Sequence, residues 1–122
     1  MITHIEIKSG TDLSLEEEKE INIAKNREWG LPPMDQKHKD NHVFALLKNS
    51  EHNILAQAQL LTLNGVIFNN ELFDIYGIGG VIVNSKNKGY GKELMRGILA
   101  YLKKSNKSAI GFTNFDVIEF YV

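Results

Sequence analysis

Residues 81–95 constrain the fold more than any other stretch of the chain, because three different patterns follow one another there. The apolar run Val81-Ile82-Val83 is typical of a buried strand, and a basic loop with two glycines follows it. Apolar side chains then recur at four-residue steps, as on one face of a helix: Tyr90, Leu94, Ile98 and Leu102. The segment therefore predicts a strand, a short loop and an amphipathic helix.

The start of this helix has the properties of an anion site. The first amide groups of a helix have no partner within it, and the helix dipole adds partial positive charge there. Gly89 and Gly91 have no Cβ, so an anion can approach the backbone closely. Three nearby side chains add positive charge: Lys86, Lys88 and Lys92. The sequence predicts that a phosphate or pyrophosphate group binds here; the alternative is an ordinary strand-to-helix turn.

Two common phosphate-binding motifs do not match this loop. A P-loop requires a glycine where Lys86 stands and a serine or threonine where Glu93 stands. A dinucleotide fingerprint starts acceptably with Gly77 and Gly79, but Ile82 occupies the position of the third glycine. Both motifs are therefore excluded.

The remaining pattern, Lys86-x-x-Gly89-x-Gly91, resembles the acyl-CoA-binding motif of the GNAT superfamily of N-acyltransferases. In that family the loop amides hold the pyrophosphate of coenzyme A. The family usually has Arg or Gln at the first position, and Lys86 keeps the charge but not the planar geometry. A second match lies later in the chain, where Asn114 and Tyr121 have the family's spacing of Asn, six residues and Tyr.

The resemblance implies an α+β fold with a central mixed β-sheet flanked by helices. It also implies an enzyme that transfers an acetyl group from acetyl-CoA to a primary amine of a small molecule or peptide by direct attack. The residues expected to bind acetyl-CoA are Val81, Ile82, Val83, Lys86, Asn87, Lys88, Gly89, Tyr90, Gly91, Lys92 and Asn114. Two alternatives stay open: a catalytically inactive acyl-CoA-binding module or truncated acetyltransferase fragment, and a structural domain whose loop binds nothing.

Direct transfer needs three groups. A backbone N–H within about residues 80–83 is expected to polarise the thioester carbonyl and stabilise the oxyanion. The resemblance assigns the general acid, which protonates the leaving thiolate, to Tyr121, because a phenol stays protonated at neutral pH. The general base is unassigned, and three residues are candidates by position only: Glu71, Asp74 and His52. Another three residues either line the acceptor pocket or pack in the core: Trp29, Leu31 and Met34.

The composition narrows the class of protein. A length of 122 residues predicts a single domain, residues 1–122. The absence of cysteine excludes disulfides, cysteine-ligated metals and a thiol nucleophile. A net charge of −1 does not indicate nucleic acid or a membrane surface as partner. The sequence has no signal-peptide pattern and no apolar run of transmembrane length, so we expect a cytoplasmic protein. His38 and His42 share a face if helical, but zinc needs more ligands, and we expect no metal site.

Capping and turn signals place the other elements. Ser14 and Glu17 form a capping box for a helix that reaches about Arg27. Asn64-Gly65 predicts a hairpin, and Asn69-Asn70 predicts a second reversal, with a short excursion between them. Strands are expected at 2–8, 43–48, 54–63, 72–83 and 109–112, a short helix within 34–42, and another helix that starts at 116–121.

The central strand and the end of the chain carry further expectations. Three glycines within residues 77–80 predict a bulge or a close backbone approach in this strand. In the resembled family, the acyl group and the pantetheine arm of the donor lie beside the same strand. The strand ends at Val81 by the family's spacing or at Val83 by the apolar alternation. The family continues with two more strands after the tyrosine, whereas this sequence ends at Val122. We therefore expect a C-terminally incomplete domain that forms a homodimer to complete its open sheet or has reduced stability.

Overall fold

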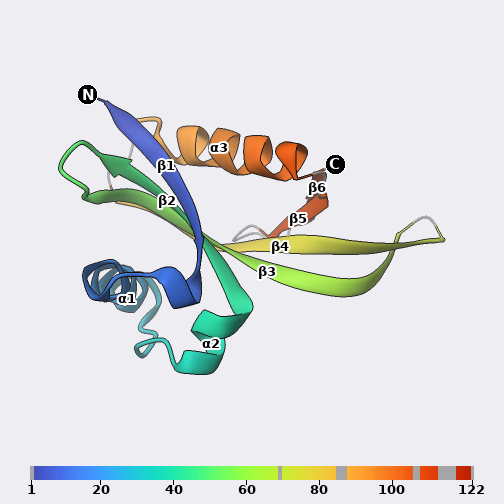
Figure 1. Ribbon diagram of the computed structural model, residues 1–122, viewed down its shortest axis with the longest axis horizontal. Coiled ribbons are helices and arrows are strands. Elements are labelled where there is room, and N and C mark those ends of the chain that lie inside the picture. Colours follow the sequence, from blue (N-terminus) through green and yellow to red (C-terminus); the bar gives the residue numbers. More distant parts are fainter. Residues whose placement is uncertain (1, 69, 85–87, 106–107, 113–117, 122) are drawn as a thin grey trace.

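One mixed sheet with helices on both faces makes up the fold (Figure 1). The computed structural model describes residues 2–68, 70–84, 88–105, 108–112 and 118–121. The strands within them are β1 (Thr3–Ser9), β2 (His42–Asn49), β3 (Ile54–Phe68), β4 (Glu71–Val83), β5 (Ser108–Phe112) and β6 (Ile118–Tyr121). The helices are the 3-10 turn η1 (Gly10–Asp12), α1 (Leu15–Trp29), α2 (Gln36–Asn41) and α3 (Tyr90–Lys104). The strands lie in chain order, and only β4 and β5 are parallel to one another, which confirms the predicted mixed α+β sheet.

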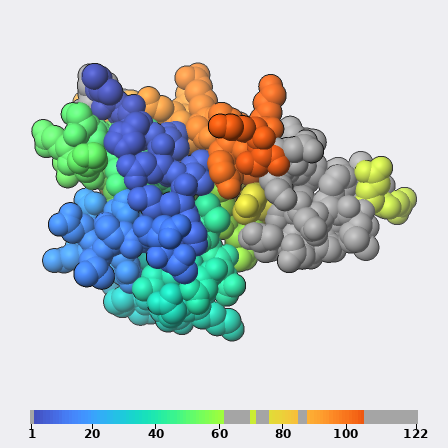
Figure 2. All heavy atoms as spheres, in the orientation of Figure 1, coloured from blue at the N-terminus to red at the C-terminus, as the bar shows by residue number. Residues whose placement is uncertain are grey.

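Helix α3 covers one face of the sheet, and its apolar stripe explains why. Leu94, Ile98 and Leu102 are buried against aliphatic residues of β2, β3 and β4. The face allows a close approach of helix and sheet, since a Cβ on Gly97 would lie 1.8 Å from Cδ1 of Ile5 on β1. Figures 1 and 2 show α3, in orange, on the opposite side of the sheet from the blue α1. The predicted helix and its buried face are therefore confirmed.

Helices α1 and α2 cover the other face. The predicted capping box is present, since the hydroxyl of Ser14 accepts from the backbone N–H of Glu17 and the Glu17 carboxylate accepts from the backbone N–H of Ser14. Ile21 of α1 packs with Phe44 and Leu46 of β2 in a second apolar cluster. Helix α1 ends at Gly30, which has a left-handed φ of 66°. In the described residues, no helix combines the length and the apolar character that a membrane span requires.

The predicted hairpin at Asn64-Gly65 is wrong. Strand β3 continues through Phe68, and the register steps from Leu63↔Ile75 to Val66↔Phe73, which places two residues of β3 opposite one residue of β4. The pair therefore forms a bulge instead of a turn, because strong strand formers follow it. The reversal occurs next to Asn70, whose φ of 63° is left-handed.

The central strand β4 runs through Val83, so that the strand end follows the apolar alternation. The register steps from Gln59↔Gly79 to Gln57↔Ile82, which places Gly80 and its successor opposite a single residue of β3. Gly80 has a φ of 59°, a conformation that glycine adopts without strain. The predicted bulge is therefore confirmed, and it lies in the middle of the sheet.

The helix expected to start within residues 116–121 is wrong over the described residues 118–121. These residues form β6, which pairs antiparallel with β5 from Phe112↔Ile118 to Ala109↔Tyr121. The physical reason is the sequence itself, because β-branched and aromatic residues favour strands and a single helical turn is marginally stable. The edge of β5 also offers backbone partners that a helix would leave unpaired.

Candidate functional site

The glycine loop leads directly into α3. Gly89 is the N-cap residue, with a left-handed φ of 75°, and no side chain of the described residues caps this helix end. A Cβ on Gly89 would meet no atom of the described residues within 4 Å, so the described part of the chain leaves room beside this helix start. Lys88 and Lys92 are exposed beside it. Unpaired amides, a positive helix end and two ammonium groups are together suited to a phosphate. Lys86 and Asn87 lie outside the described residues.

The end of β4 holds this loop in place. A Cβ on Gly91 would lie 3.1 Å from Cγ2 of Val83, so α3 begins close against the strand. Asn84 donates through its backbone N–H to Leu55 O (2.9 Å) and through Nδ2 to Ile54 O (2.6 Å), which fastens the strand end to β3. Arg27 of α1 donates to Asn84 Oδ1 (3.0 Å). The loop therefore starts from a rigid point.

Strand β4 also has an unpaired stretch on its β5 side. Among the described residues, the paired positions of β4 and β5 run only from Ile75↔Ser108 to Ile78↔Gly111. Residues 79–83 extend beyond them and reach the glycine loop. Ile82 is buried, Val83 and Tyr90 are partly buried against the core under α3, and Val81 is 38% exposed. This backbone edge is suited to an extended chain with amide groups, because strand N–H and C=O groups without a strand partner can bind it.

Solved structures share the overall arrangement of these strands and helices. A probable N-acyltransferase from Enterococcus faecalis V583 superposes with a TM-score of 0.69 at 15% identity, over 93% of this chain and 30% of that one. An acyl-CoA N-acyltransferase from Pseudomonas aeruginosa gives 0.65 at 16% identity, over 90% and 78%. The chain has the GNAT fold. The GNAT family N-acetyltransferase YhbS from Escherichia coli, determined in complex with CoA, gives 0.62 at 11% identity, over 92% and 63%.

These similarities show the GNAT fold alone. Comparison of the sequence with family models and with curated proteins finds no match. The chain spans less than a third of the length of the Enterococcus faecalis protein. The activity, substrates and partners of this chain are therefore matters of proposal.

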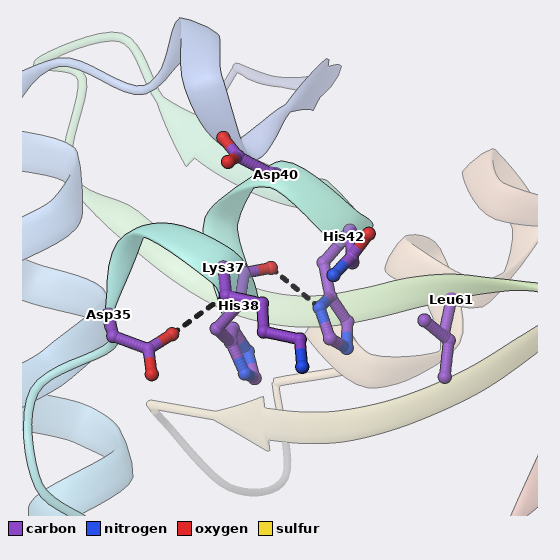
Figure 3. Close-up of a pocket in the computed structure, with 7 residues that line it drawn as sticks. Asp35, Lys37, His38, Asp40, His42 and Leu61 are labelled. Carbon is purple, nitrogen blue, oxygen red and sulfur yellow. Dashed lines mark hydrogen bonds between the residues drawn. The ribbon is translucent and has the colours of Figure 1, made fainter.

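A second candidate region lies on the α1–α2 face, at the bulge of β4. A cavity of about 300 Å³ is lined by His42, Gln59, Leu61 and residues 77–80. A neighbouring cavity of about 580 Å³ is lined by Asp35, Lys37, His38, Asp40, Asn41, His42 and Leu61 (Figure 3). His42 and Leu61 belong to both, so the two cavities adjoin. The region leads from the surface of α2 to the bulge glycines.

Two imidazole rings dominate this region. The rings of His38 and His42 are stacked, with centroids 4.0 Å apart and an interplanar angle of 12°, and Figure 3 shows them side by side. Burial, together with the charges of Lys25 and His42, lowers the pKa of His38 from 6.5 to about 4, although the charge of Asp35 acts in the opposite direction. The Asp35 carboxylate caps α2 by accepting from the backbone N–H of His38 (2.8 Å). His38 is therefore a neutral ring at physiological pH.

The histidine pair is the part of the site that sequence reasoning missed. A signal was available, since the four-residue spacing of His38 and His42 brings both to one face of a helix. The spacing was weighed only as a metal site, which was rejected in favour of ordinary surface histidines. Gln59 gave no signal, because nothing in the sequence indicates that its side chain contacts the bulge. A Cβ on Gly80 would lie 2.7 Å from Oε1 of Gln59, so Gln59 occupies the space that the glycine leaves.

Several predicted site residues are not brought to this region. His52 lies in the β2–β3 turn beside His4, with ring centroids 6.1 Å apart, and Glu71 is exposed at the end of the β3–β4 hairpin. Leu31 is exposed and lines a groove on the outer side of α1, and Trp29 is exposed too. The other predicted residues are placed as follows: Met34 packs on the apolar cluster of Ile21, Asp74 belongs to β4, Tyr121 belongs to β6, and Asn114 lies outside the described residues.

One trio among the described residues has the donor atoms of a metal site. The ligand atoms of His4, Glu6 and His52 lie within 4.8 Å of one another. However, Glu6 Oε2 already contacts His4 Nε2 (2.8 Å), and Glu6 Oε1 contacts Lys8 (3.0 Å) and Lys48 (3.1 Å). Two ammonium groups on one carboxylate disfavour a further cation, so this trio is better explained as an ion-pair cluster.

Proposed function

We propose that this protein is an N-acetyltransferase that transfers the acetyl group of acetyl-CoA to a primary amine. The observation that carries the proposal is the start of α3 at Gly89, which follows β4 through a short loop; among the described residues, the pairing of β4 with β5 ends at Ile78. A GNAT structure with the same fold was determined in complex with CoA. An anion site joined to an unpaired strand edge matches the two parts of that molecule, a pyrophosphate and an amide-containing arm.

The donor is proposed to lie along the end of β4. Its pyrophosphate binds the first amides of α3, with Lys88 and Lys92 beside it. Its pantetheine arm follows the backbone of residues 79–83, and the thioester reaches the bulge at Gly80. Lys86, Asn87 and Asn114 complete the proposed set of CoA contacts.

The proposed chemistry is direct attack. The amine nitrogen forms a bond with the thioester carbon, the carbon–sulfur bond breaks, and the amide and free CoA leave. A backbone N–H of residues 80–83 stabilises the oxyanion, and Tyr121 gives a proton to the thiolate. The cavity of about 300 Å³ beside the bulge receives the amine. No thiol on the protein takes part, in agreement with a sequence that has no cysteine.

Calorimetric titration with acetyl-CoA tests the donor site. We expect micromolar affinity, and Gly89→Glu should weaken it at least about 100-fold because the new carboxylate repels the pyrophosphate. Gly30→Glu is the matched control, since Gly30 has nearly the same left-handed φ (66° against 75°) and open space around its Cβ position, but lies at the end of α1. No binding by the folded wild-type chain, or equal affinity for both variants, would refute the site.

One observation favours a second candidate function, an acyl-CoA-binding module without turnover. Tyr121 belongs to a strand paired with β5, whereas the proposed acid was expected at the start of a helix. A measurement of CoA release distinguishes the two functions. Both proteins would bind acetyl-CoA, but only the enzyme would release free CoA when an amine is added. A homodimer that covers the edge of β6 also stays a proposal, and light scattering tests it.

A further inference from the structure

His42 lies where the two cavities of the α1–α2 face meet. It is the first residue of β2 and follows α2 directly, so its backbone is fixed by the pairing His42↔Leu61. The outer cavity beside it is lined by the two carboxylates Asp35 and Asp40 and by the ammonium group of Lys37 (Figure 3). The inner cavity is lined by residues 77–80 at the bulge. The ring of His42 therefore lines both cavities.

The hydrogen bond of His42 fixes its tautomer. Nδ1 of His42 lies 2.7 Å from the backbone oxygen of His38. A carbonyl oxygen only accepts, so Nδ1 carries the hydrogen and Nε2 of the neutral ring has a lone pair. Within the described part of the chain, no residue makes a hydrogen bond to His42 Nε2. The stacked ring of His38 holds the orientation.

His38 is different, although its ring lies parallel to that of His42. Its Nε2 lies 3.4 Å from Lys25 Nζ and 2.6 Å from Gln59 Nε2, and both of these nitrogens carry hydrogens. The lone pair of His38 is therefore used inside the protein. Because His38 is also neutral, it contributes no positive charge that would repel an ammonium group from His42. The ring of His38 therefore has a structural role, whereas the ring of His42 has a nitrogen, Nε2, that is available to accept a proton.

We propose that His42 is the general base that takes a proton from the ammonium group of the acceptor. This inference rests on the proposed function and adds a named residue to it. Nε2 of His42 takes one proton from R–NH₃⁺, and the neutral amine then attacks the thioester carbon. When the carbon–sulfur bond breaks, a second proton from the same nitrogen ends on the CoA sulfur, directly or through the general acid. His42 returns its proton to solvent through the outer cavity.

The tautomer can be measured without any enzyme activity. Nitrogen-15 NMR of the histidine side chains should show His42 as the Nδ1–H tautomer, opposite to the form preferred by a free imidazole. His4 is an internal reference, because its Nε2 lies 2.8 Å from the Glu6 carboxylate and should carry the hydrogen. An Nε2–H tautomer at His42 would overturn the assignment even if the protein is an acetyltransferase.

Kinetics with two named acceptors test the role itself. Benzylamine is mostly an ammonium ion at neutral pH and needs a base, whereas aniline is already neutral and needs none. His42→Gln should lower CoA release with benzylamine about 100-fold and with aniline by less than about threefold. His4→Gln, which changes an exposed histidine outside the cavities, should alter neither rate.

The outcomes separate the two proposals. Equal losses with both amines, or no loss with benzylamine, would overturn the role of His42 while acetyl-CoA turnover by the wild type sustains the proposed function. A wild-type chain that binds acetyl-CoA and releases no CoA with either amine would overturn both. Unchanged acetyl-CoA affinity in His42→Gln is expected, because His42 lies on the acceptor side of the bulge.

Discussion

The face of the sheet under α3 is packed with aliphatic side chains, whereas the face under α1 and α2 buries charges and amides among its apolar residues. On the α3 side the buried cluster is aliphatic throughout and includes Leu94, Ile98 and Leu102. On the other side the buried residues include Glu17, Lys48 and Gln59. Both helix layers pack on the same sheet, so the two faces differ in the kind of contact that fixes the helices to it.

Four charged residues of the α1–α2 face form one connected network: Glu6, Lys8, Glu17 and Lys48. Burial alone would raise the pKa of Glu17, but hydrogen bonds from Lys48, the backbone of Ser14 and Lys8 outweigh it and lower the pKa to about 2. The pKa of Glu6 is lowered to about 2 as well, since burial is outweighed there by bonds from His4, Lys8 and Lys48. Directional contacts of this kind fix the position of α1, while aliphatic packing tolerates rearrangement. The face with the proposed acceptor side is thus held by specific pairs.

The largest effect is expected on the aliphatic face. Ile98→Ala should lower the free energy of unfolding by about 4 kcal/mol, because the side chain is fully buried and its removal leaves a cavity. The loss should be the same near neutral pH and near pH 3, since no titrating group is removed. Urea denaturation at both values measures it. Leu99→Ala, one residue along on the exposed side of α3, is the control and should lose less than about 1 kcal/mol.

A smaller and pH-dependent effect is expected on the charged face. Glu17→Gln keeps the capping pattern but removes the charge, and should lower the free energy of unfolding by about 3 kcal/mol near neutral pH. The folded-state pKa of Glu17, about 2, lies below its ordinary value of 4.5, so its stabilisation is complete above about pH 4.5 and is lost as the pH falls toward 2. The difference between wild type and variant should therefore shrink in acid. A constant difference across this range would contradict the network.

The two faces also differ in how far they were predictable. The α3 face was predicted well, because a four-residue apolar repeat and a glycine loop are local patterns. The capping box at Ser14 and the bulge near Gly80 were local as well. The Asn64-Gly65 turn failed because the strand residues after it prevailed, and the final helix failed because pairing with β5 is a non-local effect.

Only part of the histidine site could be predicted from the sequence, for a related reason. His42, which directly follows α2, bonds to the backbone oxygen of His38 in that helix, and this contact is local. Gln59 and Lys25 reach His38 from β3 and α1, and no local pattern brings them together. The face that is held by specific pairs is the face that sequence reasoning missed. Hydrogen bonds and ion pairs between distant residues depend on the tertiary structure, and the periodicity of apolar residues in the sequence does not predict them.

The substitution with the smallest expected loss of stability, Gly10→Ala, should distinguish the two faces most clearly through its effect on turnover. Gly10 of η1 lies against α2, and a Cβ there would be 2.2 Å from the backbone oxygen of Lys39. A backbone atom cannot rotate away, so Gly10→Ala should shift α2 and cost about 2 kcal/mol. Because α2 carries His38 and ends at His42, CoA release with benzylamine at saturating acetyl-CoA should fall about tenfold, and acetyl-CoA affinity should not change.

Gly97→Ala is the matched control on the α3 face. Its Cβ would lie 1.8 Å from Cδ1 of Ile5, so it overpacks the other helix layer and should also cost about 2 kcal/mol. It should not lower turnover, because α3 contributes no residue to the cavities beside His42. If both variants lose turnover equally, the loss reflects general destabilisation. If only Gly10→Ala loses it, the position of α2 controls the acceptor side of the proposed site, and overpacking under α3 does not affect it.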